Sequence, residues 1–338
     1  GENESVLAVA SERKALWKIG ITNTRSFAPG NVAMLNEKGI LSKPVVTFEL
    51  PRTKRADMNH AAKHLQKLLQ KATRERVCDV EEVGVAFSGG LDSSVVASLA
   101  KHSEVMAHLI CVGLTGQPEI EPAKQAAEIL RLPLRVQTYS AADAEKTLSK
   151  VLWLIEEPSA LKASVAIPFF WTAEIASKLG LHVLLAGQGA DELFGGYRKY
   201  LTEYANDGGK KAQQSMYHDV ATSYETNFQR DEPVCAYHKV ELRLPFADAR
   251  VVRYALSLAL NLKIKSADDT LRKRVLRQVA KNIGIPISIA DKPKKAVQFT
   301  TGVDKALERL SKRKGLTKRS YIQEVFQHVF QGWKVKKG

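Results

Sequence analysis

The sequence predicts an α/β protein built on a parallel β-sheet with helices on both faces, followed by a mostly helical C-terminal part. From Val83 onward, short apolar runs alternate with helical stretches, which is the pattern of strands joined by crossover helices. A glycine-rich turn at residues 88–94 joins one such run to a helix, as the ligand-binding turns of these sheets do. Beyond Tyr197 the apolar spacing is mostly helical.

The individual elements follow from local patterns. Residues 1–50 carry strand-like fragments at 6–9 and 45–50 with a Pro29-Gly30 turn between them, and they do not look like a whole domain. Apolar residues at helical spacing predict an amphipathic helix over residues 58–76. The strands that we expect beyond it cover residues 83–87, 105–112, 134–138 and 182–186. One helix is expected after Asp92, and the others cover residues 122–130, 142–155, 169–179, 251–262 and 271–282.

Composition restricts the class of protein. A chain of 338 residues that is 44% hydrophobic can bury a sizeable core and allows about two domains. No stretch approaches the ~20 apolar residues that span a bilayer, and the first residues lack the features of a signal peptide, so we expect a cytoplasmic protein. The cysteines are Cys78, Cys111 and Cys235. Their odd number and wide spacing indicate neither a disulfide framework nor a metal cluster.

The net charge of +15 would attract phosphate-bearing partners such as a nucleotide, an RNA or an anionic surface. Much of the excess lies in four late runs, at residues 272–274, 292–295, 312–314 and 334–337. Aromatic residues are not interleaved with these runs. We therefore favour a solvated basic face over a dedicated nucleic-acid site.

The turn at residues 88–94 has the sequence Ser-Gly-Gly-Leu-Asp-Ser-Ser and is predicted to bind phosphate. Its backbone amides and the following helix N-terminus converge on a point suited to an anion, and the serines can donate hydroxyl groups. Asp92 fits such a site if Mg²⁺ lies between its carboxylate and the phosphate oxygens. The alternative is an ordinary glycine-rich turn with a helix cap. The turn also lacks the Gly-Lys-Ser/Thr ending of a Walker-type loop.

A second apolar strand leads into a similar segment at residues 187–197, Gly-Gln-Gly-Ala-Asp-Glu-Leu-Phe-Gly-Gly-Tyr. Asp191 can supply another Mg²⁺ ligand from the same edge of the sheet. Two carboxylates from two turns are better evidence for a metal than one. The alternative is that Asp191 and Glu192 merely cap the next helix.

The first turn resembles the pyrophosphate loop of the ATP pyrophosphatase superfamily, which has the adenine nucleotide alpha hydrolase-like fold. With the second motif, in this order and spacing, it resembles the synthetase domain of the asparagine synthetase family. Three further segments agree over roughly residues 58–310. They are residues 111–114 with Pro118 and Ala123, residues 241–248 (Glu-Leu-Arg-Leu-Pro-Phe-Ala-Asp), and Lys292-Pro293-Lys294 with Gln298 and Phe299.

The resemblance implies an AMP-forming carbon–nitrogen ligase that uses ATP and Mg²⁺. Such an enzyme adenylates a carboxylate, with aspartate the leading candidate, releases pyrophosphate, and then forms an amide with ammonia. The implied metal ligands are Asp92 and Asp191, and the implied catalytic residues are Lys294, Gln188 and Asp191. The residues implied for ATP and pyrophosphate are Ser88, Gly89, Gly90, Asp92, Ser93, Ser94, Val112, Leu114, Gly187, Gly189, Lys294 and Lys295.

The sequence departs from the family pattern in the acceptor region. Many asparagine synthetases carry Glu where this chain has Gln188, and an amide cannot act as a base. Gln188 could still orient ammonia or the intermediate by hydrogen bonding. Lys162 and Ser164 lie where the family binds its acceptor, and their surroundings are only partly similar. Adenylation is thus better supported than the identity of the acceptor.

Residues 10–16 and 27–30 resemble the last strands of the family's N-terminal glutaminase domain. We therefore expect residues 1–50 to be the end of a truncated class II glutaminase domain and residues 51–338 to be the synthetase domain. The glutaminase nucleophile of the family is an N-terminal Cys, and this chain has no Cys before Cys78. The sequence is interpreted as a fragment of a longer amidotransferase, because orphaned strands expose edges. A protein that takes free ammonia, or a separate glutaminase subunit, is the alternative.

Two other functions remain open. An RNA-modifying ATP pyrophosphatase would explain the basic charge, but the Asp191 motif and the absence of a suitable Cys pair count against it. A nucleotide-binding regulatory or assembly subunit without catalysis is motivated by Gln188, although both carboxylates of the presumed metal site are retained. The oligomeric state and the use of the basic tail are not determined by the sequence.

Overall fold

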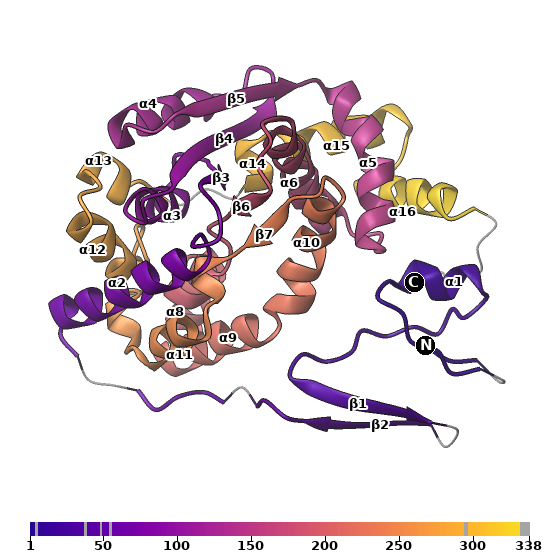
Figure 1. Cartoon of the computed structure of the whole chain (residues 1–338), viewed down its shortest axis with the longest axis horizontal. Helices are drawn as coiled ribbons and strands as arrows, with labels where there is room; N and C mark the ends of the chain where they lie inside the picture. Colours follow the sequence, from indigo (N-terminus) through magenta and orange to yellow (C-terminus); the bar gives the residue numbers. More distant parts are fainter. Residues whose placement is uncertain (4–5, 37–38, 48, 54–55, 294–296, 332–338) are drawn as a thin grey trace.

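The computed structural model describes residues 1–338 except 4–5, 37–38, 48, 54–55, 294–296 and 332–338. Its centre is a five-stranded sheet in the order β5-β4-β3-β6-β7, and every neighbouring pair is parallel (Figure 1). The strands are β3 (Glu82–Ala86), β4 (Met106–Leu114), β5 (Leu134–Tyr139), β6 (Val183–Leu185) and β7 (Glu241–Arg243). The predicted fold class is confirmed.

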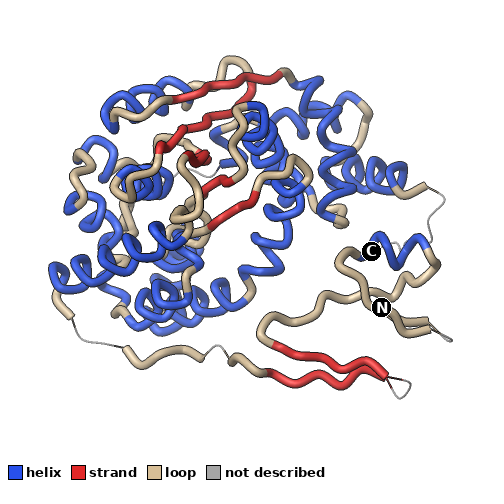
Figure 2. Tube along the Cα trace, in the orientation of Figure 1, coloured by secondary structure: helices blue, strands red, loops and turns tan. Residues whose placement is uncertain are grey.

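Side chains on β4 alternate between two hydrophobic clusters. Ala107 and Leu109 belong to one cluster, whereas Ile110 and Leu114 belong to the other, because successive side chains of a strand point to opposite faces. Figure 2 shows helices on both sides of the strands. Those of the first cluster are α2 (Met58–Glu75), α3 (Leu91–Lys101), α4 (Ile120–Leu130), α7 (Ala190–Phe194), α11 (Ala249–Ser257), α12 (Arg274–Asn282) and α13 (Ile287–Ala290). Those of the second are α1 (Arg13–Lys18, through Trp17), α5 (Ala141–Ile155), α6 (Ala160–Lys178), α10 (Gln229–Ala236), α15 (Val303–Arg313) and α16 (Lys318–Val329).

The order of the strands creates a switch point beside β3. The chain runs from β3 outward to β4 and β5, and then returns to place β6 on the other side of β3. The turns after β3 and β6 therefore open next to each other at the carboxyl edge of the sheet. Crevices at such switch points are where open parallel sheets bind ligands.

Helix boundaries differ from the predictions in the second half of the chain. α6 begins at Ala160, nine residues before the start predicted at residue 169, and continues through Pro168. It is buried on nearly all sides, so its apolar residues show no amphipathic period that would mark the start. The helix predicted over 251–262 ends at Ser257, and α12 begins only at Arg274. β7 was not predicted, because its three residues carry charge at both ends.

The N-terminal region differs most. β1 (Asn31–Asn36) and β2 (Gly39–Pro44) form an antiparallel hairpin that lies apart from the main sheet (Figure 1). The strands predicted over 6–9 and 45–50 are wrong, since those described residues lie outside the strands, although Leu7 makes an isolated bridge with Glu2. The segment at 10–16 leads into helix α1 (Arg13–Lys18) rather than a strand. The predicted turn at Pro29-Gly30 is present, with Gly30 at a φ of 75°.

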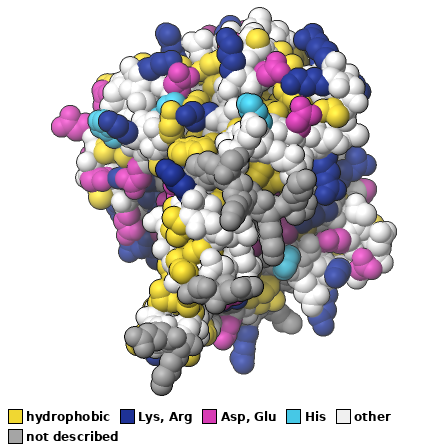
Figure 3. Space-filling view, turned by 90° about the vertical axis from the view of Figure 1, so that its right-hand side faces the viewer, with side chains coloured by type: hydrophobic (Ala, Val, Ile, Leu, Met, Phe, Trp, Pro, Cys, Tyr) yellow, Lys and Arg dark blue, Asp and Glu magenta, His cyan; other side chains and the backbone are white. Residues whose placement is uncertain are grey.

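The hairpin is only thinly covered by the rest of the chain. Val32, Met34 and Leu41 are each more than half exposed. In the space-filling view, hydrophobic side chains gather on the projecting lower part of the molecule (Figure 3). Among the described residues, no helix combines the length and the apolar character that a membrane crossing requires.

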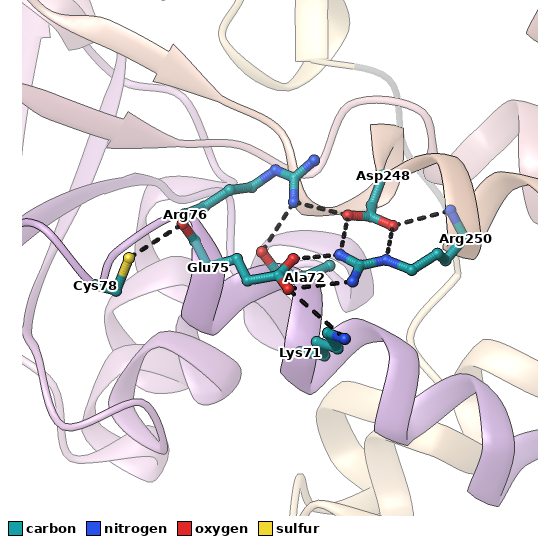
Figure 4. A network of polar contacts seen from close by, with 7 residues as sticks. All are labelled: Lys71, Ala72, Glu75, Arg76, Cys78, Asp248 and Arg250. Carbon is teal, nitrogen blue, oxygen red and sulfur yellow. Dashed lines mark hydrogen bonds and ion pairs between the residues drawn. The ribbon is translucent and has the colours of Figure 1, made fainter.

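The segment at 241–248 fastens the end of α2 to the start of α11 (Figure 4). Asp248 caps α11 by accepting a hydrogen bond from the Arg250 backbone N–H at 2.9 Å, and its carboxylate pairs with the Arg250 guanidinium. Arg76 reaches the same carboxylate at 3.2 Å. Arg250 also pairs with Glu75 on α2. This part of the family-like segment therefore supports the sheet edge and does not line the pocket described below.

Candidate active site

The turn after β3 packs tightly against α4. Gly89 has a φ of 66°, and a Cβ at this position would lie 2.7 Å from the Ala123 Cα. Glycine therefore meets both the left-handed backbone and the close approach. Gly90 is the N-cap residue of α3, so the first N–H groups of that helix face the turn. Ser93 Oγ lies 3.2 Å from Ser88 Oγ and 3.2 Å from the Gly90 carbonyl oxygen, which closes the loop on itself.

The turn after β6 lies against the first turn. A Cβ at Gly187 would be 2.9 Å from Asp92 Cβ, so only a glycine lets the two loops come this close. The chain then enters the short helix α7, whose first turn carries Asp191 and Glu192. Asp92 and Asp191, which come from the two separate turns, therefore lie in one region at the switch point.

Lys273 joins these two carboxylates. Its Nζ lies 2.7 and 2.6 Å from the Asp92 carboxylate oxygens and 2.7 Å from Asp191 Oδ1. The Lys273 residue is only 1% exposed. The interpretation of residues 272–274 as part of a solvated basic face is therefore wrong for Lys273. The sequence does not distinguish Lys273 from Arg272 and Arg274, the basic residues on either side of it, which are not buried as Lys273 is.

Arg277 positions the loop that carries Lys273. Its buried guanidinium donates to the backbone carbonyl oxygens of Leu271, Arg272, Ala290 and Lys292. These four hydrogen bonds connect the residues just before α12 to the C-terminal end of α13 and the segment that follows it. Arg277 lies on the amphipathic helix α12, and its local sequence did not distinguish it from an arginine on the exposed face of that helix.

A pocket of about 360 Å³ opens over both turns. Its polar end is formed by Ser88, Asp92, Asp191 and Lys273, and the rest of its lining mixes apolar side chains with polar ones, among them Gln188, Arg230 and Lys292. The apolar and aromatic lining residues are Ala86, Phe87, Leu91, Ile110, Cys111, Val112, Ile120, Leu161, Val165, Pro168, Phe169, Ala186, Tyr197 and Pro293. A polar end and an apolar cleft are the usual build of a site for a small molecule that carries a charged group.

The structure brings half of the residues predicted for ATP and pyrophosphate to this pocket, namely Ser88, Gly90, Asp92, Ser93, Val112 and Gly187. Gln188 and Asp191, which were predicted as catalytic residues, line it as well. Ser94 is fully buried beneath the loop, and Leu114 belongs to the hydrophobic core. Gly89 and Gly189 shape the two turns with positive φ angles and do not line the pocket.

The late basic motif, Lys292-Pro293-Lys294, is described only as far as its first two residues. Lys294 and Lys295 lie outside the described residues. The preceding Lys292 and Pro293 do line the pocket, and Lys292 Nζ lies 3.4 Å from the Gly89 carbonyl oxygen. The first residue of the late basic motif therefore contacts the phosphate-type loop directly.

The predicted acceptor residues do not line this pocket. Lys162 Nζ is hydrogen-bonded to Glu157 at 2.5 Å and to the Glu225 carbonyl oxygen at 2.9 Å. Ser164 is fully buried, and its hydroxyl donates to the Leu161 carbonyl oxygen within α6. The same helix presents Leu161 and Val165 to the pocket instead.

Gln188 is held in the pocket wall by a buried ion pair. Its Nε2 donates to Asp231 Oδ2 at 2.6 Å, and Asp231 forms a bidentate pair with Arg230 at 2.6 and 2.8 Å. Glu192 lies nearby, accepting hydrogen bonds from Tyr197 and Asn227, and burial raises the pKa of its carboxyl. Arg230 and Asn227 line the pocket but were not predicted, because only the fold brings α10 and the segment before it beside the β6 turn.

Asp92 and Asp191 fit a hard cation that is shared with a ligand. They place carboxylate oxygens around one point that already accommodates positive charge. Across the described part of the chain, no group of three or more His, Cys, Asp or Glu side chains is arranged to hold a metal ion. Mg²⁺ prefers octahedral oxygen ligands and commonly completes them with phosphate oxygens and water. The residues therefore fit Mg²⁺ carried by a phosphate-bearing substrate.

Comparison with known proteins supports a family assignment. The family described as asparagine synthase matches residues 64–210 and 200–332. A Methanocaldococcus jannaschii protein named as a glutamine-hydrolysing asparagine synthetase is 30% identical over 364 residues, which cover 94% of this chain and 67% of that protein. Asparagine synthetase 1 of Arabidopsis thaliana is 29% identical over 225 residues, 63% of this chain and 38% of that protein.

The chain therefore spans less than half the length of the plant relative. The solved structure of NMN synthetase from Francisella tularensis aligns with a TM-score of 0.39 and 13% sequence identity, covering 84% of this chain and 98% of that one. That overlap is too weak to add to the assignment. On the family match and the archaeal relative, the chain belongs to the asparagine synthase family.

Proposed function

We propose that this chain is the synthetase part of an ATP-dependent amidotransferase. In this reaction a carboxylate, with aspartate the leading candidate, attacks the α-phosphorus of ATP and displaces pyrophosphate. Ammonia then attacks the acyl-adenylate and displaces AMP. Membership of the family supports an ATP-dependent ligase. The identities of the acceptor and of the nitrogen donor are proposed here.

One observation carries the proposal. The glycine-rich turn, the N-terminus of α3 and the carboxylates of Asp92 and Asp191 converge at one end of a pocket that also has apolar wall residues. An adenine ring and a triphosphate need these two environments side by side. In this arrangement the backbone amides of the turn and the Ser88 and Ser93 hydroxyls bind the pyrophosphate oxygens as negative charge develops on them.

Asp92 and Asp191 would hold Mg²⁺, which when bound neutralises the charge of the phosphate oxygens. Gln188 offers a neutral amide in the pocket wall, which suits hydrogen bonding to an amine or a carbonyl group and not proton removal. Lys294, or Lys295 next to it, would add positive charge near the transferring phosphorus. Their roles remain proposals carried by the resemblance.

The source of nitrogen follows from the relatives' names. Both are named as glutamine-hydrolysing, and the chain spans 67% of one and 38% of the other. We propose that a glutaminase domain or subunit supplies ammonia in the whole enzyme. Added ammonium salts can replace that supply in a test of the synthetase part.

The test is the formation of AMP and pyrophosphate from ATP with Mg²⁺, ammonium and a panel of small carboxylates. We expect turnover with aspartate and with no other carboxylate of the panel. ADP as the product, or no pyrophosphate with any carboxylate, contradicts the proposal. Binding of ATP without turnover would favour the non-catalytic alternative.

Two matched variants connect the chemistry to the site. Asp191→Asn removes a carboxylate from the polar end and is expected to lower pyrophosphate formation by about 10²-fold or more, because charge stabilisation at the leaving phosphate is lost. Asp268→Asn changes an exposed carboxylate that forms a hydrogen bond with Ser266 and lies outside the pocket, and it is expected to leave the rate unchanged. Equal rates for the two variants would remove Asp191 from the site.

A further inference from the structure

The ammonium of Lys273 lies where a metal would have to bind. Its Nζ contacts both oxygens of Asp92 and one oxygen of Asp191, all between 2.6 and 2.7 Å. The side chains of Asp92 and Asp191 are 18% and 14% exposed, whereas that of Lys273 is 2% exposed. The lysine is thus almost wholly buried where it meets the carboxylates, and all three side chains lie at the polar end of the pocket.

The backbone is shaped to deliver this lysine. Arg272 and Lys273 both have a φ of 52°, a left-handed conformation that is unfavourable for a residue other than glycine. The Arg277 guanidinium holds this loop by its bonds to the Leu271 and Arg272 carbonyl oxygens. Gly196 leaves room beside the pair, since a Cβ there would overlap Asp191 Oδ1 and the Lys273 side chain.

Folding stability alone gives little reason for this arrangement. A buried lysine loses its hydration, and buried ion pairs rarely stabilise a protein more than apolar side chains of similar size. The two carboxylates come from the two ligand-binding turns of the switch point, so the lysine neutralises an acidic pair that stands at the polar end of the pocket. A function for the lysine at that pair is therefore the better explanation.

We infer that Lys273 is a tethered cation that occupies the metal position when nucleotide is absent, so that Mg²⁺ enters this site only together with the phosphates of a nucleotide. This inference rests on the proposed use of ATP and Mg²⁺. The carboxylate oxygens cannot closely hold an ammonium and a divalent cation at the same point, because the two like charges repel. Phosphate oxygens resolve the conflict, since they add ligands for the metal and give the displaced ammonium a new anionic partner.

The inference predicts how the protein responds to a metal without nucleotide. Mn²⁺ serves as the probe, because its binding can be followed by electron paramagnetic resonance and by thermal unfolding. Wild-type protein is expected to show no Mn²⁺ site below millimolar concentration until a non-hydrolysable ATP analogue is added. Tight Mn²⁺ binding by the wild-type protein without nucleotide would overturn the inference.

Lys273→Met is the decisive variant, since it keeps an unbranched side chain and removes the charge. It should acquire a Mn²⁺ site in the absence of nucleotide, at least about tenfold tighter than any wild-type binding, and its unfolding temperature should rise with Mn²⁺. Lys281→Met is the matched control on helix α12, which follows Lys273 directly, because Lys281 pairs with Asp291 at the surface. It should behave as wild type.

A second variant assigns the new metal site to its residues. Adding Asp191→Asn to Lys273→Met should abolish the acquired Mn²⁺ binding. A Lys273→Met protein that folds and ignores Mn²⁺ contradicts the inference, and if it does not fold, the wild-type titration decides. Because these titrations involve no turnover, they remain informative if pyrophosphate formation fails. In that case the proposed function falls while the competition between lysine and metal is still measured.

Discussion

Gln188 is oriented in the pocket wall by one neighbour. Because its Nε2 must face the Asp231 carboxylate, its amide oxygen is the atom left to accept hydrogen bonds from a ligand. Asp231 is fully buried and already paired with Arg230, so its negative charge is balanced inside the protein. Position 188 therefore offers a neutral acceptor that suits an incoming N–H group.

Gln188→Glu should destabilise the protein in a pH-dependent way. The change removes the donor and sets a second carboxylate against Asp231, so the pKa of the introduced carboxyl is expected to rise above about 4.3. The folded state then binds more protons than the unfolded state, and stability falls as pH rises. We expect a loss of about 2 kcal/mol or more at pH 8 and a smaller loss at pH 5, measured by urea unfolding.

The double variant Gln188→Glu/Asp231→Asn restores a donor and an acceptor across the same contact. It should recover much of the stability that the single variant loses at pH 8. An equal loss at both pH values, or no recovery in the double variant, would mean that repulsion with Asp231 is not the cause.

At the scale of elements, the end of α2 is clasped to the start of α11 by charged side chains (Figure 4). Asp248 is the centre of this clasp, since it caps α11 and pairs with Arg250 and Arg76. The Arg250 hydrogen bonds, together with Arg76, hold the pKa of the Asp248 carboxyl well below its usual range. The connection from β7 to α11 thereby keeps the sheet edge against α2.

Asp248→Asn should cost about 1–2 kcal/mol of unfolding free energy at pH 7, because a helix cap and a charged acceptor are both weakened. The wild-type contribution is present above the unfolded-state pKa of about 3.9 and is lost as pH falls toward the lower folded-state pKa. The difference between the two proteins should therefore shrink below pH 4 in urea unfolding. A difference that stays constant down to pH 2 would rule out the charged form of Asp248 as its source.

At the scale of the whole molecule, the N-terminal region is tied to the second helical layer. The Trp17 ring lies 5.1 Å from the Phe330 ring and 6.2 Å from the Phe326 ring, measured between centroids. The Glu156 carboxylate, at the end of α5, accepts hydrogen bonds from the first two backbone N–H groups of α1 at 2.8 Å each. These contacts join residues near the start of the chain to α16 and α5.

Trp17→Ala should loosen this region without affecting the pocket. Truncation of a buried tryptophan costs about 3–5 kcal/mol of stability. Here we expect it to lower the free energy of local unfolding of α1. We expect tryptic cleavage at Arg13 and Lys18 to accelerate by at least about tenfold, while ATP binding is unchanged. Phe27→Ala alters an aromatic residue that is 47% exposed and should leave cleavage unchanged. Loss of ATP binding in the tryptophan variant would show that the N-terminal region supports the active site.

The strongest sequence signals were local ones. A glycine-rich turn between an apolar strand and a helix is a short-range pattern, and Ser88, Asp92 and Asp191 were found through it. Strands β3, β4, β5 and β6 of the central sheet were found because their apolar runs are short and bounded by turns, whereas β7 was missed. Prediction failed where the local pattern carried no such boundary. The start of α6 was missed because this helix is buried on nearly all sides. Residues 10–16 are predicted as a strand, but they lead into α1, whose Trp17 packs against Phe326, a residue far along the chain.

By itself the sequence determined the parallel α/β fold, the family and the two turns at the switch point, because each is written in residues that are neighbours along the chain. Only the tertiary structure decided what surrounds those turns. Lys273 is 181 residues from Asp92, and Asp231 is 43 residues from Gln188, yet each pair is in hydrogen-bond contact. A buried charge and a surface charge look alike in a sequence, since burial depends on which helices the sheet order brings together.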